Sequence, residues 1–305
     1  MRVAADRVIG LDVGGTKTLG AVVDAKGGLH ATQEVATVST SRDALLAQLE
    51  TVVEKLLGHE RRAAALGFGF PSRIDQRTGV LVASVNVPFE NIDVRRMLAE
   101  RFGLPVFVDN DGNVAAIAEW RVGAGRGVDD IVMLTLGTGV GGGLILGGRP
   151  YRGATGVGGE LGHMVVELDG LECPCGGHGH LEMYASGRAA DRVARELLGP
   201  EADGRELVRR ARQGEAGPRD AIATIGRHLG AGLVTIVNVF DPDLIVIGGG
   251  FSEAGSLLVD PARAYVEREA LYPARDRVRI VPAQLGLRAG VIGAGMIAFE
   301  ALETG

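Results

Sequence analysis

The sequence predicts an α/β protein of two lobes, each built from strands and helices. The chain has 305 residues, 46% of them hydrophobic, so it is long and apolar enough to bury two cores. A glycine-rich hairpin of two strands occurs near the start of the chain, and a second hairpin of the same kind begins at Asp130. The two hairpins indicate one structural unit that is used twice.

The first unit begins with two short strands. Residues 7–12 form a β-branched run that meets a turn at Gly14 and Gly15, and strand character resumes over 18–24. Residues 45–57 carry apolar side chains at helical spacing. The other elements expected in this half are a buried strand over 63–70, a strand over 106–108 and an Ala-rich helix through 118–120.

The second unit repeats the order of strand, glycine-rich turn and strand. Residues 131–136 run into the glycines of 137–143, and the chain leaves through 144–146. No low-complexity linker separates the lobes, so their boundary is expected near residues 118–126. The remaining elements are helices over 188–198, 206–212 and 219–238, strands over 244–247 and 278–282, and a small-residue helix over 290–302.

Composition argues against several classes of partner. The net charge is −6 and no run of lysine or arginine occurs, so nucleic-acid binding through phosphate neutralisation is not expected. No apolar run reaches the length of a membrane span, and the first residues lack the apolar core of a signal peptide. With only two cysteines, both explained below by a metal, the expected location is the reducing cytoplasm.

One segment of eighteen residues holds both cysteines and three of the six histidines. Thiolate and imidazole at short separation are the ligands that a tetrahedral Zn²⁺ prefers. His163, Cys173, Cys175 and either His178 or His180 would complete a Cys2His2 set. The alternative is a disulfide or two free thiols, but cysteines one residue apart form a bridge only with strain. A structural zinc ion is therefore expected.

Three glycine-containing turns follow β-rich runs and suit an anionic ligand. Glycines allow main-chain N–H groups to approach phosphate oxygens, and Asp12 at a strand end is suited to hold Mg²⁺ through water. The first turn is neither a Walker A sequence nor a dinucleotide fingerprint, and alone it would equally fit a tight hairpin. Together the turns are what two lobes closing over a nucleotide would need. They comprise Gly14, Gly15, Thr16 and Lys17; Gly137, Thr138 and Gly139; and Gly248, Gly249 and Gly250.

Carboxylates occur in two further regions, at a strand-to-helix junction and beside the predicted zinc loop. Asp111 lies at a strand-to-helix junction, where it would either cap the helix or accept a proton from a sugar hydroxyl. A helix N-terminus favours the ionised form, so Asp111 is expected to be charged at neutral pH. Glu160 and Glu182 flank the predicted zinc loop and are either solvated or acceptors for hydroxyl groups. His163 can direct one ring nitrogen to zinc and the other to a ligand.

Together these segments resemble the ROK family (repressors, open reading frames and sugar kinases), and the match favours its bacterial glucokinases. The segments cover almost the whole chain in the family's order. They are 12–17, 108–111, 137–143, 159–163, 173–182, 184–188 and 247–250.

The resemblance implies two ribonuclease-H-like lobes of the actin and hexokinase superfamily, with MgATP and a hexose in the cleft between them. The small lobe would comprise residues 1–118 and about 291–305, and the large lobe would comprise 119–290 with the zinc loop at 163–182. The implied activity is ATP-dependent phosphorylation of glucose at the 6-hydroxyl. Family members commonly form homodimers, so a homodimer is expected.

The resemblance also assigns roles to single residues. Asp111 takes the position of the catalytic base, and the adenosine side falls on the turn at Gly248. Residues on the sugar positions are Asn86, Asn110, Asp111, Glu160, His163 and Glu182, with 69–71 in a closing loop. Residues on the phosphate side are Asp12, Thr16, Lys17 and Thr138.

The chain departs from the family pattern at three places. His180 stands where a third cysteine is usual, so the implied zinc ligands are His163, Cys173, Cys175 and His180. Ser72 replaces a glycine after the turn at 69–71, and 287–288 replace a more polar pair.

Two alternatives to a glucokinase remain open. The acceptor could be another hexose, such as N-acetylglucosamine, N-acetylmannosamine, mannose or fructose, and the donor could be polyphosphate. A sugar-responsive repressor would need an N-terminal helix-turn-helix, and only about six residues precede the first predicted strand, so an enzyme is expected.

Overall fold

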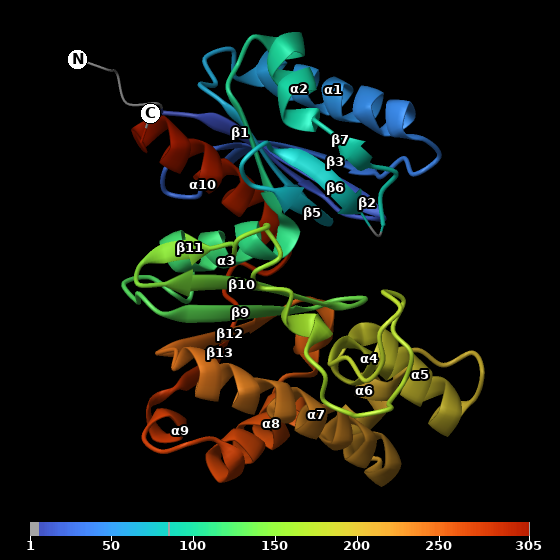
Figure 1. Cartoon of the computed structure of the whole chain (residues 1–305). Helices are drawn as coiled ribbons and strands as arrows, with labels where there is room; N and C mark the ends of the chain where they lie inside the picture. Colours follow the sequence, from blue (N-terminus) through green and yellow to red (C-terminus); the bar gives the residue numbers. More distant parts are fainter. Residues whose placement is uncertain (1–5, 85, 305) are drawn as a thin grey trace.

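The computed structural model of the chain describes residues 6–84 and 86–304. It contains two α/β lobes, one above the other, with two helices between them (Figure 1). Each lobe is organised around a five-stranded sheet, and the sheets belong to separate halves of the sequence. The predicted two-lobed α/β class is confirmed.

The upper sheet has the strand order β3-β2-β1-β4-β8. β1 pairs with β2 in antiparallel fashion, whereas β1, β4 and β8 are parallel to one another. The strands are β1 (Val8–Val13), β2 (Lys17–Val23), β3 (Leu29–Ala36), β4 (Leu66–Phe70) and β8 (Val106–Asn110).

The lower sheet repeats this arrangement in the order β11-β10-β9-β12-β13. Again the first strand of the unit forms an antiparallel hairpin with the second and runs parallel to the two strands on its other side. The strands are β9 (Ile131–Leu136), β10 (Val140–Leu146), β11 (Arg149–Tyr151), β12 (Leu244–Gly248) and β13 (Arg279–Pro282). The same unit therefore builds both lobes, as the two hairpins predict.

Helices α3 (Asp111–Val122) and α10 (Ala289–Thr304) pack against each other between the two sheets (Figure 1). The close approach of the two helices requires glycine, because a Cβ atom on Gly293 of α10 would overlap the carbonyl oxygen of Val114 on α3. Glycine also brings α10 against β4, where a Cβ atom on Gly67 would overlap the Ala294 carbonyl oxygen. One buried apolar cluster combines side chains of both helices with side chains from both sheets. The lobes thus share a core at their junction.

Other elements cover the outer faces. The upper lobe carries helices α1 (Arg42–His59) and α2 (Val94–Phe102) and a small sheet of β5 (Ser72–Asp75), β6 (Val80–Ser84) and β7 (Glu90–Ile92). The lower lobe carries α4 (Glu182–Ala185), α5 (Gly187–Leu198), α6 (Gly204–Arg212), α7 (Ala216–Phe240), α8 (Ser256–Glu269) and α9 (Ala274–Arg277). Short 3-10 helices are η1 (Leu161–His163), η2 (Gly250–Ala254) and η3 (Gly286–Arg288).

Several elements differ from the sequence expectation. β10 begins at Val140 rather than at residue 144, because glycines inside the strand leave room for α3: a Cβ atom on Gly143 would collide with Ala116. The helices α2 and α8 and the small sheet β5-β6-β7 were not expected. Their apolar positions are too few or too interrupted, as by Pro261 within α8, to give a clear period.

The expectation that no apolar run reaches the length of a membrane span is wrong for α7. This helix has 25 residues and is long and apolar enough to qualify by length and composition. Half of its most apolar window is buried inside the protein, and α8 packs along it. Its apolar character is explained by its place in the core of the lower lobe.

Candidate active site

The predicted site residues gather at the carboxyl ends of the parallel strands. In the upper sheet, β1 ends beside Asp12, β4 passes through Gly69, and β8 leads directly into Asp111. A Cβ atom on Gly69 would lie 3.8 Å from both the Asp111 Cα atom and the Asp12 Oδ1 atom. Residues from three separate parts of the sequence therefore meet at one edge, which is the usual position of a ligand site in parallel sheets.

Asp111 is the first residue of α3, and its neighbour provides the helix cap. The Asn110 side-chain oxygen accepts hydrogen bonds from the backbone N–H groups of Gly112 and Asn113, at 2.8 and 3.3 Å. The Asn110 amide also donates to the Ser72 carbonyl oxygen at 3.3 Å. Asn110 therefore caps the helix, and Asp111 is not needed for capping.

The ionisation of Asp111 differs from the sequence expectation. The pKa of this carboxyl is raised from 3.8 to about 7, first by burial and then by the nearby carboxylates of Asp12 and Glu160, against a hydrogen bond from the Gly112 N–H. The helix N-terminus is therefore outweighed by desolvation and like charge. The expectation of a fully charged carboxylate at neutral pH is wrong: near pH 7 the group is divided between its two forms.

Asp12 lies in the same buried region. Burial raises its pKa from 3.8 to about 6, although the Lys17 ammonium opposes the rise. A Cβ atom on Gly290, at the start of α10, would overlap the Asp12 carboxylate, so this helix begins directly against it. Asp12 and Asp111 are two neighbouring carboxyls with raised pKa values, a pattern that occurs at functional sites.

The first glycine turn closes the β1–β2 hairpin. The Gly14 N–H donates to the Lys17 carbonyl oxygen at 2.9 Å. The Lys17 ammonium contacts a carboxylate oxygen of Glu34 on β3, also at 2.9 Å. A Cβ atom on Gly15 would lie 2.7 Å from the Asn86 Cβ atom, so the predicted sugar residue Asn86 packs against the predicted phosphate turn.

The second and third glycine turns meet at the carboxyl edge of the lower sheet. The second follows β9 and the third follows β12, and these two strands are parallel neighbours. A Cβ atom on Gly249 would overlap the Leu136 backbone, which immediately precedes the second turn. At Gly139 a Cβ atom would overlap a carboxylate oxygen of Glu182, so the second turn also contacts a predicted sugar residue.

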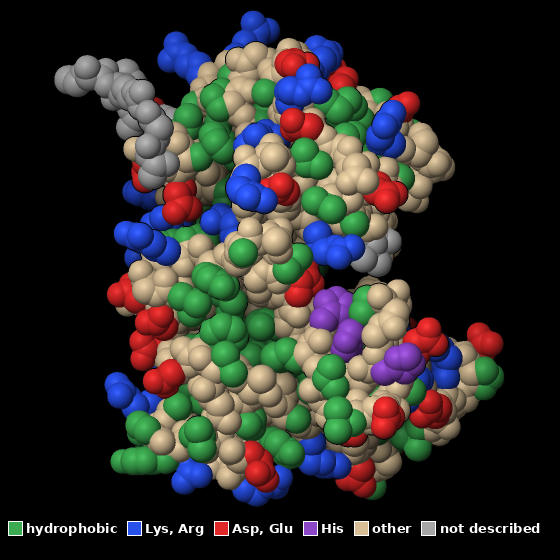
Figure 2. Space-filling model, viewed as in Figure 1, with side chains coloured by type: hydrophobic (Ala, Val, Ile, Leu, Met, Phe, Trp, Pro, Cys, Tyr) green, Lys and Arg blue, Asp and Glu red, His purple; other side chains and the backbone are tan. Residues whose placement is uncertain are grey.

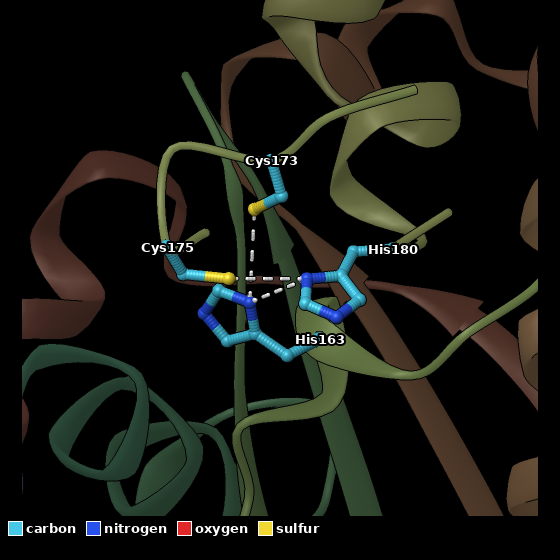
Figure 3. A group of neighbouring side chains, drawn as sticks. All are labelled: His163, Cys173, Cys175 and His180. Carbon is cyan, nitrogen blue, oxygen red and sulfur yellow. Dashed lines mark hydrogen bonds between the residues drawn. The ribbon is translucent and has the colours of Figure 1, made fainter. Parts of the chain in front are cut away.

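The four predicted metal ligands converge at one point (Figure 3). One ligand atom from each of His163, Cys173, Cys175 and His180 lies within 4.8 Å of the others. The two Nδ1 atoms are 3.3 Å apart, and the Cys175 sulfur lies 3.3 Å from the His180 Nδ1 atom. Around a tetrahedral Zn²⁺, nitrogen ligands are separated by about 3.3 Å and nitrogen from sulfur by about 3.6 Å. The donor set and its spacing therefore fit this ion. His178 is exposed and lies outside the cluster.

The candidate metal-ligand cluster adjoins the predicted sugar residues. His163 directs Nδ1 into the cluster, while its Nε2 atom lies 3.7 Å from a carboxylate oxygen of Glu160. The Cys173 thiol donates to a Glu182 carboxylate oxygen at 2.9 Å, and burial together with this contact raises the pKa of the thiol to about 12. The cluster thus holds the loop that presents Glu160 and Glu182.

Figure 2 shows the surface hollowed between the two lobes, with histidine side chains along the lower margin of the hollow. The other predicted site residues differ in exposure from one another. Asn86, Thr16 and Thr138 are exposed, whereas Asn110, Glu160 and Glu182 are partly buried.

The structure also locates two departures from the family pattern. The Ser72 hydroxyl forms a hydrogen bond with the Ser84 hydroxyl, and residues 287–288 are exposed in η3.

Asp109 and Arg152 form a buried contact that the sequence analysis missed. The Asp109 side chain is only 2% exposed, and its Oδ2 atom lies 2.6 Å from the Arg152 Nε atom. Its Oδ1 atom accepts hydrogen bonds from Asn113 Nδ2 at 2.9 Å and from Gln76 Nε2 at 3.3 Å. Arg152 lies 43 positions along the chain, so no local spacing identifies the pair. The contact joins the upper sheet to the segment that leads to Glu160.

Replacing Arg152 by Met is expected to lower the free energy of unfolding by about 3 kcal/mol, because it leaves the buried Asp109 carboxylate without its cation. Urea unfolding followed by circular dichroism measures the change. Arg149→Met, at an exposed position on β11, is the control and should change stability by less than about 0.5 kcal/mol. Adding Asp109→Asn to Arg152→Met should recover part of the loss; equal stability of Arg152→Met and the unaltered protein would contradict the assignment.

This fold and site define a protein of the class that contains the two-lobed sugar kinases. The family model for the ROK family matches residues 8–301, and the chain belongs to that family. It is 35% identical to the glucokinase of Streptomyces coelicolor, over 96% of this chain and 97% of the relative. It also resembles the structure of a ROK family glucokinase from Streptomyces griseus in complex with glucose and AMPPNP, with a TM-score of 0.86, 36% identity and coverage of 96% and 99% of the two chains.

Repressors of the same family are similar as well. The xylose repressor of Bacillus spizizenii is 27% identical over 96% of this chain and 77% of the repressor. The glucokinase of Streptomyces coelicolor has the higher identity and is matched over more of its own length, and the similarity therefore supports a sugar kinase that uses ATP.

Proposed function

We propose that the protein phosphorylates glucose at the 6-hydroxyl with ATP as the donor. The observation that carries this proposal is the Asp111 carboxyl, which lies partly buried at the start of α3 and has a pKa raised to about 7. A general base works best when its pKa lies near the working pH. In this proposal Asp111 faces the glycine turns of the two lobes, where a hydroxyl acceptor and a phosphoryl donor would meet.

In this proposal Asp111 accepts the proton of the sugar 6-hydroxyl while that oxygen attacks the γ-phosphorus of ATP and ADP leaves. Phosphoryl transfer depends mainly on positioning and charge neutralisation, so one well-placed carboxylate suffices as base. The sugar hydroxyls would be bound by Asn86, Asn110, Glu160, His163 and Glu182. Because the Asn110 amide already bonds the Ser72 carbonyl and its oxygen caps α3, its share would include holding Asp111 in place.

The nucleotide would lie across the three glycine turns. The first and second turns, with Thr16, Lys17 and Thr138, would bind the phosphates, and Gly248, Gly249 and Gly250 would line the adenosine side. Asp12 would hold Mg²⁺ through water; a cation there would favour the ionised form of the carboxyl, whose pKa is raised by burial.

We further propose a structural zinc ion in the cluster of His163, Cys173, Cys175 and His180, where it would supply rigidity to the loop that carries Glu182. The small lobe would comprise residues 1–118 with about 291–305, and the large lobe 119–290. A cytoplasmic homodimer without nucleic-acid or membrane partners completes the proposal. Light scattering of the purified protein would test the dimer.

A coupled assay of ADP release over a panel of hexoses tests the function. The panel would contain glucose, mannose, fructose, N-acetylglucosamine and N-acetylmannosamine, each with ATP and with polyphosphate as donor. We expect the highest kcat/KM for glucose with ATP. No turnover of any hexose with either donor would overturn the proposal and favour the sugar-responsive regulator.

The pH dependence of activity is a separate prediction. Because the base must be ionised, kcat/KM for glucose is expected to rise with pH up to about 7 and to level above it, with a slope of no more than tenfold per pH unit. The apparent pKa will belong to the coupled carboxyls of Asp111 and Asp12. Initial rates from pH 5 to 8.5 measure the profile, and a flat profile across this range would contradict it.

A further inference from the structure

Two segments of the chain join the lower sheet to the helices α3 and α10. The first, residues 123–130, runs from the end of α3 to β9. The second, residues 283–288, runs from β13 to α10. The two joining segments are far apart in sequence, yet both pass the carboxyl-terminal end of α3, where one side chain contacts them together.

That side chain is Glu119, which is fully buried. Its Oε2 atom accepts a hydrogen bond from the Ala124 N–H at 2.8 Å, in the first joining segment. Its Oε1 atom accepts hydrogen bonds from the N–H groups of Gln284 and Leu285, at 2.9 and 2.8 Å, in the second segment. One carboxylate therefore joins both segments to the same helix.

The chemistry of this contact requires a carboxylate. A buried charge is costly unless it is hydrogen-bonded, and here three backbone donors point at its two oxygens. An amide of the same shape has one acceptor and one donor, so it would serve one segment and oppose the other. The adjacent chain also makes room: a Cβ atom on Gly123 would overlap the Glu119 Oε2 atom.

The joined elements carry the proposed catalytic groups. Asp111 begins α3, and the second joining segment leads into α10, which starts against Asp12. The first segment leads into β9, which ends at the turn of Gly137. A shift of one segment relative to α3 would therefore change the distance between the base and the phosphate turns, and small misplacements of reacting groups are expensive in rate.

We propose that Glu119 is a positioning residue that couples the two joining segments, so that the Asp111 helix and the nucleotide turns of the lower sheet move together when the lobes close. This inference rests on the proposed hexose kinase function. Closing motions in kinases turn about a few such connecting positions, far from the reacting atoms.

The variants Glu119→Gln and Gly123→Ala test the coupling from two sides. In Glu119→Gln the amide oxygen would still accept the hydrogen bonds from the N–H groups of Gln284 and Leu285. The amide NH2 would then face the Ala124 N–H, and the hydrogen bond to the first segment would be lost. In Gly123→Ala the new methyl group would displace the same Oε2 atom. Both should lower kcat for glucose at least tenfold while changing the KM for glucose less than threefold. The double variant should be no slower than the worse single variant, because both changes break the same hydrogen bond.

Hydrogen exchange measured by mass spectrometry provides a readout that does not depend on activity. In both variants, exchange should become faster in peptides covering 123–130 and stay unchanged in those covering 283–288. Gly58→Ala, at a position on α1 with no heavy atom within 4 Å of the new methyl group, is the control and should leave both kcat and exchange unchanged.

The outcomes separate the possible failures. If the variants unfold at a lower temperature but the folded enzyme keeps the kcat of the unaltered protein, Glu119 is structural only and the inference is overturned. Additive losses of kcat in the double variant would show that the two changes do not act through the same hydrogen bond. If Glu119→Gln does not fold, Gly123→Ala carries the test. Absence of hexose turnover in the unaltered protein refutes the proposed function, while unchanged exchange over 123–130 in the variants refutes the bridge itself.

Discussion

Asp111→Asn is expected to lower kcat for glucose phosphorylation by roughly 10²- to 10⁴-fold, the range that general-base catalysis supplies. Asparagine keeps the shape of the side chain and its place at the start of α3, but it cannot accept the proton of the hydroxyl. The coupled assay of ADP release measures kcat, and the KM for glucose should change much less. Asp43→Asn, an exposed aspartate in the first turn of α1, is the matched control and should keep full activity.

The same substitution is expected to stabilise the protein, with a pH dependence of definite sign. The pKa of Asp111 is about 7 in the folded protein, against 3.8 for the ordinary carboxyl. As the pH rises from about 4 to 7, the unfolded chain loses this proton first, so the carboxyl destabilises the fold progressively and by a constant amount above pH 7. Asp111→Asn should therefore raise Tm at pH 8 and have little effect at pH 4. A kcat within tenfold of the unaltered enzyme, or a lower Tm at pH 8, would remove Asp111 from this role.

His180→Ala is expected to abolish stoichiometric zinc binding, whereas His178→Ala should retain about one ion per chain. Of these two histidines, His180 lies in the cluster with His163, Cys173 and Cys175, and His178 does not. Three remaining ligands hold the ion less tightly, and the binding free energy of a structural zinc contributes to folding. Metal analysis of protein purified without chelator measures the stoichiometry.

The loss of zinc is also expected to affect stability and sugar binding. Tm should fall by about 5 °C or more in His180→Ala, which corresponds to about 3 kcal/mol for a protein of this size. The KM for glucose should rise at least tenfold, because the loop carries Glu182 and His163. His180→Cys should retain the ion, because thiolate is an equally suitable ligand. If His178→Ala binds no zinc and His180→Ala still binds it, the fourth ligand is His178 rather than His180.

Local sequence patterns were sufficient to predict features whose determining residues all lie in one short stretch of the chain. The hairpin of β1 and β2 and that of β9 and β10 are specified by β-branched runs and the glycines between them. The four candidate metal ligands lie within eighteen residues, so their convergence needs only one loop. Elements whose apolar positions lack a clear period were not recognised, among them α2 and α8.

The ionisation of the candidate base illustrates what local pattern leaves out. A helix N-terminus favours a charged aspartate, and the sequence alone shows only that term. The opposing terms come from burial and from Asp12 and Glu160, which lie 99 positions before and 49 positions after Asp111. Since desolvation and like-charge repulsion act through space, they could not be weighed before the lobes were assembled.

By itself the sequence determined the two-lobed α/β class, the repeated unit, the glycine turns and the candidate metal ligands apart from the choice between His178 and His180, because each depends on residue type and spacing within a short stretch. The tertiary structure alone decided the raised pKa of Asp111, the Asp109–Arg152 contact and the bridge made by Glu119 between residues 124 and 284–285. Those features depend on burial and on contacts between segments brought together only by folding, for which neighbouring residues carry no signal.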